Sequence, residues 1–175
     1  PAAIAAASAL AYHAVYTPLK TRSFAATLTG AVPGALPMLI GWTAATGTID
    51  RGGLALFAIG YLWQLPHVLG LAWMLRKDYE RVGFKLIPGG GAKVIGFYMV
   101  LATGLLVPVS WVPTYLGYTG MIYAVAATVL GGAFMFTGVT AALNLTDARA
   151  RKVFFASLLY RPLLLAFMLF DTVRL

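Results

Sequence analysis

The sequence has no cysteine and very few acidic residues. The lack of cysteine excludes disulfides, thiolate metal sites and cysteine nucleophiles. Its five carboxylates stand against a hydrophobic content of 61% and a mean hydropathy of +0.84. They are Asp50, Asp78, Glu80, Asp147 and Asp171. Because a soluble domain of this length needs a largely polar surface, the composition indicates that the solvent is lipid.

Basic residues outnumber acidic ones by thirteen to five, which gives a formal charge of +8. Such an excess can indicate nucleic-acid binding. Here Lys and Arg occur in short clusters between long apolar runs, a pattern typical of membrane proteins. We therefore expect the lipid bilayer, and no nucleic acid, as a partner.

The apolar runs predict an all-α fold, a polytopic bundle of about six transmembrane helices, since about 20 mostly apolar residues cross the hydrocarbon core. The runs are too long and continuous for the alternating strands of a barrel. The predicted spans are Ala2 to Tyr16, Phe24 to Trp42, Leu54 to Leu75, Val94 to Val112, Gly120 to Leu143 and Val153 to Val173.

The distribution of charge supports six spans. Ten cations fall in the loops after the first, third and fifth spans: Lys20, Arg22, Arg76, Lys77, Arg81, Lys85, Lys93, Arg149, Arg151 and Lys152. The other loops and the tail hold only Arg51 and Arg174, and Arg161 lies inside the last span. The positive-inside rule makes the basic side cytoplasmic. We expect a multi-pass protein of a bacterial or archaeal cell membrane, or of the mitochondrial inner membrane in a eukaryote.

The chain begins at Pro1, in an apolar run without the charged region of a signal peptide. We expect residues 1–175 to form a single transmembrane domain whose natural N-terminal part is missing. Glycine and proline recur inside the second and fifth predicted spans. Two compatible interpretations are close helix packing through small residues and a kinked wall that shapes a substrate cavity.

The densest polar segment runs from Arg76 to Pro88 and includes Asp78 and Glu80. One interpretation is a solvated loop whose charges only set the topology. The other is a site for an anionic diphosphate, because carboxylates can hold Mg²⁺ while Lys and Arg neutralise phosphates. The basic candidates here are Arg76, Lys77, Arg81 and Lys85.

A second polar segment, Tyr61 to His67, lies inside the third predicted span. Gln64 and His67 are three residues apart, so we expect them to share a helical face. They can form an interhelical hydrogen-bonding pair, or they can contact a polar or metal-bearing ligand, since imidazole is a common axial ligand of haem iron. Trp63 belongs to the same segment.

A third segment, Tyr16 to Arg22, follows the first predicted span, which we expect Pro18 to end. It is either an ordinary basic loop or a second wall of an anion pocket, with Lys20 and Arg22 facing the Asp78 loop. We interpret His13 as a satisfied helix residue. Arg161 and Asp171 are too far apart along one helix to pair.

In this order and spacing, the segments resemble the haem O synthase (protohaem IX farnesyltransferase) branch of the UbiA prenyltransferase superfamily. The matching stretches are Tyr16 to Arg22, Gly30 to Trp42, Trp63 to His67, Asp78-Tyr79 with Gly83 and Leu86 to Pro88, and Ser157 to Tyr160. The resemblance implies a nine-helix fold whose helices four to nine are present here. It also implies that a first acidic motif lies in the missing part.

The resemblance implies transfer of a farnesyl group from farnesyl diphosphate to a vinyl group of haem b, which gives haem O and diphosphate. Mg²⁺ would be the cofactor, held by Asp78 and Glu80. Catalysis would involve Asp78, Lys20 and Arg22, and diphosphate would contact Arg76, Lys77, Arg81 and Lys85. The implied haem-side residues are His67, Trp63, Gln64 and Tyr16, and haem A synthase is an implied partner.

Two alternatives stay open at this point. One is another enzyme of the same superfamily that prenylates a quinone precursor or a chlorophyll-type alcohol acceptor. The other is a transporter or a non-catalytic membrane subunit, which would favour ionisable residues at mid-membrane, whereas most of them here lie at the edge.

Overall fold

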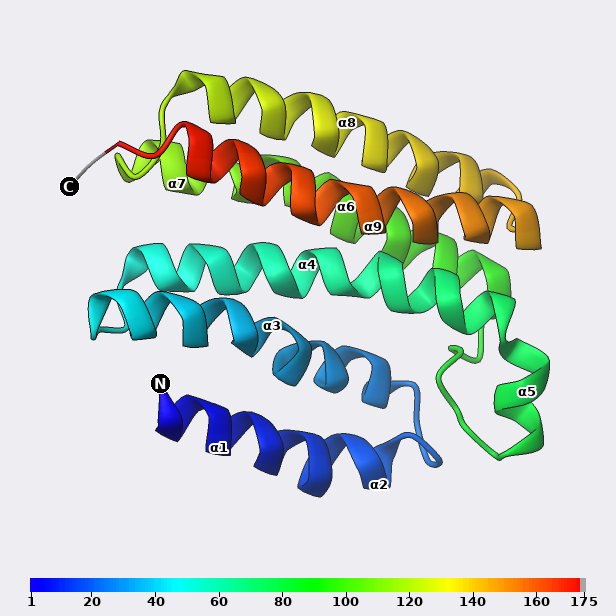
Figure 1. Cartoon of the computed structure of the whole chain (residues 1–175). Helices are drawn as coiled ribbons and strands as arrows, with labels where there is room; N and C mark the ends of the chain where they lie inside the picture. Colours follow the sequence, from blue (N-terminus) through cyan, green and yellow to red (C-terminus); the bar gives the residue numbers. More distant parts are fainter. Residues whose placement is uncertain (174–175) are drawn as a thin grey trace.

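The computed structural model describes residues 1–173, and the fold is helical throughout that range (Figure 1). The helices are α1 (Ala2–Leu10), the π-helix η1 (Ala11–Tyr16), α2 (Thr17–Leu19), α3 (Ala25–Thr46), α4 (Arg51–Met74), α5 (Arg76–Arg81), α6 (Gly91–Ser110), α7 (Val112–Tyr115), α8 (Met121–Leu143) and α9 (Asp147–Phe170). Arg174, counted above with the C-terminal tail, lies outside the described residues.

Six segments within the described range are long and apolar enough to cross a membrane, as predicted. They are Ala2–Leu19, Ala25–Thr46, Arg51–Met74, Gly91–Tyr115, Met121–Leu143 and Asp147–Phe170. The protein is therefore a multi-pass integral membrane protein.

The prediction that Pro18 ends the first span was wrong, because the helix continues to Leu19. Pro18 lies in the first turn of α2, directly after the π-helix η1. The backbone N–H of Thr17 bonds to the carbonyl of Tyr12, five residues earlier, and the Thr17 hydroxyl donates to the same carbonyl at 3.0 Å. This wider turn accommodates a residue that has no N–H to donate.

Helices α4, α6, α8 and α9 form a four-helix bundle, and α3 packs on the outside of α4. The α1–η1 segment packs in turn on α3 (Figure 1). Large side chains that are fully buried fill the bundle, among them Tyr123, Phe134, Met99 and Leu106. The hydroxyls of Ser110 and Tyr160 lie 2.8 Å apart inside it, so each is hydrogen-bonded despite its burial.

Small residues bring the helices close, as one interpretation of the glycines predicted. A Cβ on Gly96 of α6 would lie 2.7 Å from Cα of Ala142 on α8. A Cβ on Gly138 of α8 would lie 3.0 Å from the Thr103 hydroxyl of α6. Gly41 and Gly132, in contrast, face open space. Close backbone approach matters because lipid gives helices no hydrophobic drive to associate.

One of the two prolines of α3 is accommodated by a neighbouring helix. Pro37 has no N–H to bond to the carbonyl of Pro33, four residues earlier. The hydroxyl of Ser8 on α1 donates to that carbonyl at 3.3 Å. The bond joins α1 to α3 at the wall of a cavity that Pro33 also lines.

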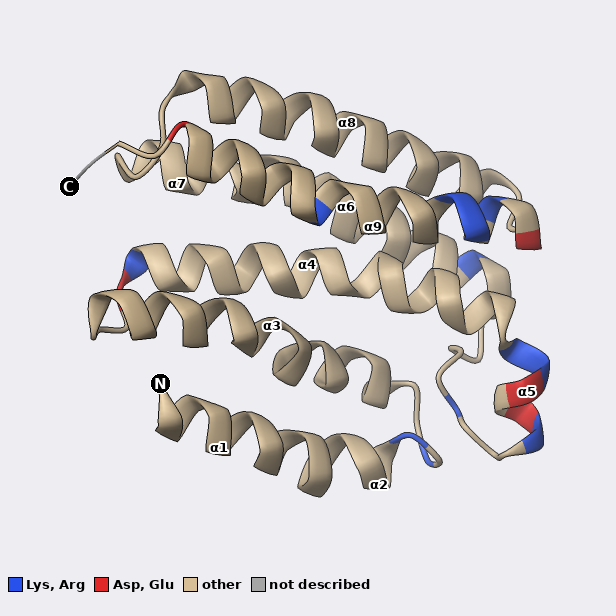
Figure 2. Cartoon of the chain, viewed as in Figure 1, with Lys and Arg blue, Asp and Glu red and all other residues tan. Residues whose placement is uncertain are grey.

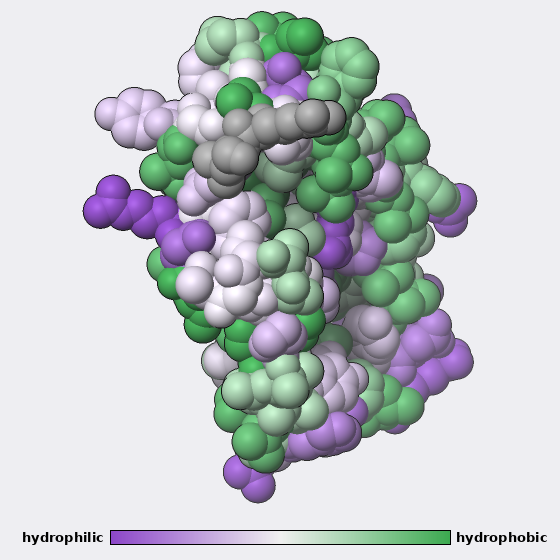
Figure 3. Space-filling view, turned by 60° about the vertical axis from the view of Figure 1, so that its left-hand side comes forward, coloured by the Kyte–Doolittle hydropathy of each residue, from purple (hydrophilic) through white to green (hydrophobic). Residues whose placement is uncertain are grey.

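Charge and apolar surface divide the molecule into layers. Figure 2 shows Lys and Arg gathered at one end, on α5, in the turn that follows α2 and on the first turns of α9. Asp50 and Arg51 mark the start of α4 at the opposite end. Apolar side chains, among them Phe97, Phe136 and Leu159, are exposed between the two ends. Figure 3 shows the hydrophobic surface, in green, from another side.

Candidate active site

Two loops meet at the basic end. The backbone N–H of Lys85 donates to the carbonyl of Lys20 at 2.7 Å. The ammonium of Lys20 lies 4.9 Å from the centroid of the Phe84 ring. The loop after α2 and the loop after α5 therefore form one continuous surface.

A capping motif at the end of α5 sets the position of Phe84. Gly83 has a φ of +73°, which favours glycine. The Gly83 N–H bonds to the Glu80 carbonyl and the Phe84 N–H to the Tyr79 carbonyl, the two bonds of a Schellman motif. The rings of Tyr79 and Phe84 are 5.8 Å apart. Burial raises the pKa of the Tyr79 hydroxyl.

The predicted metal ligands Asp78 and Glu80 lie on α5, and both are exposed. Residues two apart on a helix point to different sides, so the helix does not bring the two carboxylates together. Asp78 instead lies 3.6 Å from the guanidinium of Arg81. Among residues 1–173, no three His, Cys, Asp or Glu side chains cluster in a way that could hold a metal ion.

A single carboxylate still fits Mg²⁺ at a diphosphate site. Mg²⁺ keeps several waters and is usually bound through one or two carboxylates plus substrate phosphates. Asp78 can provide one such ligand, since it is exposed beside the basic loops. The donor set of the described residues thus fits a partial site, in which phosphate and water complete the shell.

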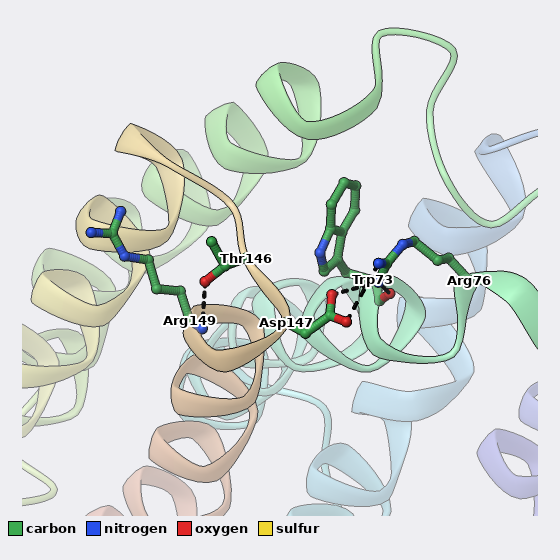
Figure 4. Close-up of polar contacts among 5 residues, drawn as sticks. All are labelled: Trp73, Arg76, Thr146, Asp147 and Arg149. Atoms are coloured by element: carbon green, nitrogen blue, oxygen red, sulfur yellow. Dashed lines mark hydrogen bonds and ion pairs between the residues drawn. The ribbon is translucent and has the colours of Figure 1, made fainter.

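Arg76, predicted to bind diphosphate, has another partner. Its guanidinium bonds to the carboxylate of Asp147 at 2.6 Å and to the carbonyl of Trp73 at 2.6 Å (Figure 4). It also stacks over the Trp73 ring, 4.8 Å from the centroid. Asp147 begins α9, and Thr146 caps that helix by accepting from the Arg149 N–H (Figure 4). Arg76 therefore joins the end of α4 to the start of α9.

The remaining basic candidates stay available for an anion. Arg22, Lys77, Arg81 and Lys85 are exposed, and Lys20 is half-buried against Phe84. They lie on α5 and on the two loops that the Lys85–Lys20 bond joins. Their arrangement suits a multiply charged anion that approaches from water.

A cavity of about 550 Å³ lies between α1–η1, α3 and α4. Tyr16 and Gln64, two of the predicted haem-side residues, line it. Glycines make room for both: a Cβ on Gly30 would lie 2.6 Å from the Tyr16 ring, and one on Gly34 would lie 2.9 Å from the Gln64 amide. Leu86, from the loop after α5, also lines this cavity and so connects it to the basic end.

The other two predicted haem-side residues face α9. The indole N–H of Trp63 donates to the Ser157 carbonyl at 2.7 Å, and Nδ1 of His67 lies 2.8 Å from the Ser157 hydroxyl. The His67 ring is stacked between Trp63, at 4.9 Å, and Phe154, at 4.8 Å. Gln64 and His67 lie three residues apart on α4, as predicted, but their side chains contact different helices, α3 and α9. His67 matches the interhelical hydrogen-bonding interpretation.

Sequence reasoning missed three residues of this region. His13 lines the cavity with Tyr16 and Gln64. It lies in a π-helix, which often marks a functional site but which only the structure reveals. Ser157 binds both Trp63 and His67. The guanidinium of Arg161 stacks over Trp63, with Cζ 4.7 Å from the ring centroid. Sequence spacing pointed only to partners on the same helix, so it did not reveal this contact.

The comparison with known families agrees with this geometry. The model of the UbiA prenyltransferase family matches residues 1–159, nearly the whole chain. The chain belongs to the UbiA prenyltransferase family. As a UbiA chain, it has the multi-pass helical bundle and the basic, carboxylate-bearing loop after the third span that the resemblance implied.

Curated relatives of this UbiA chain carry the name protoheme IX farnesyltransferase. The relative from Solibacter usitatus is 42% identical, and the match covers 97% of this chain and 59% of the relative. The relative from Sorangium cellulosum is 43% identical, with 93% and 59% covered. The relative from Salinibacter ruber is 44% identical, with 91% and 57% covered. The chain thus spans somewhat more than half the length of these relatives. No solved structure matches the chain significantly.

Proposed function

We propose that the protein transfers a farnesyl group from farnesyl diphosphate to a vinyl group of haem b. Residues 1–175 form one transmembrane domain of this enzyme. The observation that carries the proposal is the junction of Lys20 and Lys85, where two basic loops meet beside a cavity in the bundle, at the same end of the molecule as α5 with its exposed Asp78. The names of the relatives support the choice of haem as acceptor.

The reaction breaks the bond between C1 of the farnesyl group and its diphosphate oxygen, and the electron pair leaves with diphosphate. The π electrons of the vinyl group form the new bond to C1. Water then adds to the carbon next to the porphyrin and loses a proton, which gives the hydroxyethylfarnesyl group of haem O. The first step develops negative charge on diphosphate, so fixed cations lower its barrier.

The basic loops bind and orient diphosphate in this proposal. Lys20 is fixed on Phe84, while Arg22, Lys77, Arg81 and Lys85 complete the cationic surface. Asp78 is the proposed Mg²⁺ ligand, and Glu80 has a weaker claim because it points to another side of α5. Bound Mg²⁺ would neutralise diphosphate as it leaves.

The cavity beside Leu86 is the proposed haem side. Gln64 and Tyr16 line it, and the amide of Gln64 has no hydrogen-bond partner within residues 1–173. Apolar walls keep water from the farnesyl cation until the vinyl carbon has reacted. Trp63 and His67 support this wall from behind by fixing α4 to α9.

The direct test is incubation of the full-length protein in lipid nanodiscs with haem b, farnesyl diphosphate and Mg²⁺, followed by mass spectrometry of the extracted pigment. The proposal predicts a mass increase equal to one farnesyl group plus one hydroxyl group. A quinone precursor serves as the competing acceptor. Prenylation of the quinone precursor but not of haem b would contradict the haem assignment, and no prenylation at all would favour the transporter or subunit alternative.

The proposal includes location and partner. The basic loops face the cytoplasm of a bacterial cell, in line with the positive-inside rule and with the bacterial relatives. Haem A synthase, which would receive haem O, is the proposed partner in the membrane.

A further inference from the structure

Arg161 lies in the middle of α9, far from both ends of this membrane-spanning helix. It is the fifteenth of 24 residues in this helix, so its Cα lies about 21 Å from Asp147 and about 14 Å from Phe170 along the axis. A cation at such a depth is costly and usually serves a partner or a ligand. The side chain of Arg161 contacts two other helices, α4 and α3.

The chain fixes this guanidinium in place. Its Cζ lies 4.7 Å from the centroid of the Trp63 ring on α4, and its Nη2 lies 3.4 Å from the sulfur of Met38 on α3. Trp63 cannot turn freely because its N–H donates to the Ser157 carbonyl, one turn before Arg161. An aromatic face and a thioether are weak partners for a cation.

No carboxylate within residues 1–173 lies in salt-bridge range of Arg161. The five acids are placed elsewhere: Asp50 caps α4, Asp78 lies by Arg81, Glu80 is exposed on α5, Asp147 pairs with Arg76, and Asp171 accepts from the Tyr123 N–H. A guanidinium has five N–H donors in a fixed fork that matches a carboxylate. Most of those donors have no protein partner among the described residues, although Arg161 is only half-buried.

We propose that Arg161, supported by Trp63, binds the carboxylate of an apolar ligand in the membrane-spanning part of the molecule, where α9 meets α4 and α3. The ligand's identity rests on the proposed function, in which haem b supplies the carboxylate through a propionate. Propionates and vinyl groups occupy opposite edges of this porphyrin. With a propionate at Arg161, midway along α9, the opposite vinyl edge is free to face the basic end, where Asp78 and Lys20 lie. A lipid carboxylate is the other source, with its chain in the 660 Å³ cavity that Met38 and Leu165 line.

The experiment compares binding of haem b and of haem b dimethyl ester, whose propionates carry no charge. Both are titrated by absorbance into the wild-type protein and the Arg161→Gln, Arg161→Lys and Arg151→Gln variants in nanodiscs. We expect the wild type to bind haem b at least about tenfold more tightly than the ester, the usual effect of a charge-assisted hydrogen bond. Arg161→Gln binds both porphyrins with the affinity of the ester, and Arg161→Lys restores part of the difference.

Controls separate this site from structural effects. Arg151 is exposed on the same helix, so Arg151→Gln keeps the full difference. The melting temperature of Arg161→Gln stays the same or rises, because removal of an unpaired cation costs no ion pair. Oleate, a lipid acid, is compared with oleyl alcohol, which has no carboxylate. Displacement of haem b from the wild type by oleate, together with equal binding of the two lipids to Arg161→Gln, supports the carboxylate site and identifies a lipid acid as a second occupant.

Equal affinity of the wild type for haem b and its ester overturns the Arg161 site, even if farnesyl transfer occurs. An equal loss for both porphyrins in Arg161→Gln overturns it as well, since that result reports a change of structure. A preserved propionate effect without farnesyl transfer contradicts only the proposed function. Failure of the wild type to bind either porphyrin contradicts both proposals.

Discussion

The backbone N–H of Lys85 donates to the carbonyl of Lys20 at 2.7 Å, across 65 residues of sequence. This bond joins the loop after the first span to the loop after the third. It places Phe84 under the ammonium of Lys20. The cationic surface proposed for diphosphate depends on this junction.

Removal of the Phe84 ring tests whether Lys20 needs its aromatic support. We expect Phe84→Leu to raise KM for farnesyl diphosphate about two- to fivefold, the effect of an exposed cation–π contact. The pigment assay under initial-rate conditions measures this change. Phe97, exposed on α6, provides the control, and Phe97→Leu leaves KM unchanged. The same change in both variants would contradict a role for the Lys20–Phe84 contact.

Substitutions of Asp78 and Glu80 distinguish a metal ligand from a surface charge. We expect Asp78→Asn to lower kcat by roughly 100-fold, because Mg²⁺ would lose its protein carboxylate. Glu80→Gln, on a different side of α5, lowers kcat by less than about threefold. Raised Mg²⁺ partly restores Asp78→Asn, which a structural defect would not permit. Unchanged turnover in Asp78→Asn removes the metal assignment.

Gln64 and His67 have different partners, and their substitutions differ accordingly. We expect Gln64→Leu to weaken haem b binding about tenfold with little change in melting temperature, because its amide faces the cavity. His67→Leu lowers the melting temperature, because it breaks the bond between α4 and Ser157. Titration with haem b and thermal unfolding in detergent measure the two effects. The reverse pattern would contradict the assignment of Gln64 to the haem cavity and of His67 to the α4–α9 contact.

Gly96 tests how closely α6 and α8 must approach. A Cβ there would lie 2.7 Å from the Cα of Ala142, and backbone cannot move aside cheaply. We expect Gly96→Ala to destabilise the fold by about 1–3 kcal/mol. Gly41→Ala is the matched control, since nothing lies within 4 Å of its added methyl group. Equal unfolding midpoints for both variants in a denaturing detergent would show that the α6–α8 contact is not tight.

Hydropathy and charge predicted the six spans because both are properties of local sequence. The end of the first span was predicted wrongly, since a proline signal carries no information about the π-helix that precedes it. The partners of Gln64, His67 and Arg76 depend on which helices pack beside them. Sequence spacing shows that Gln64 and His67 are near neighbours on α4, but it cannot show that α3 lies beside one and α9 beside the other.

Arg161 illustrates the same limit. The sequence showed a cation inside a span and no acid one turn away on the same helix. Its contacts come from α4 and α3, more than 90 residues earlier in the chain. Only the fold brings Trp63 and Met38 to it.

The absence of cysteine allows a clean labelling experiment on the shared basic surface. Arg22→Cys, Lys85→Cys and Arg51→Cys, made one at a time, are exposed to a membrane-impermeant maleimide in right-side-out and inverted vesicles. The account predicts that Arg22→Cys and Lys85→Cys react in inverted vesicles only, and Arg51→Cys in right-side-out vesicles only. Reaction of Arg22→Cys and Lys85→Cys from opposite sides would contradict a common diphosphate surface and the prenyl transfer built on it.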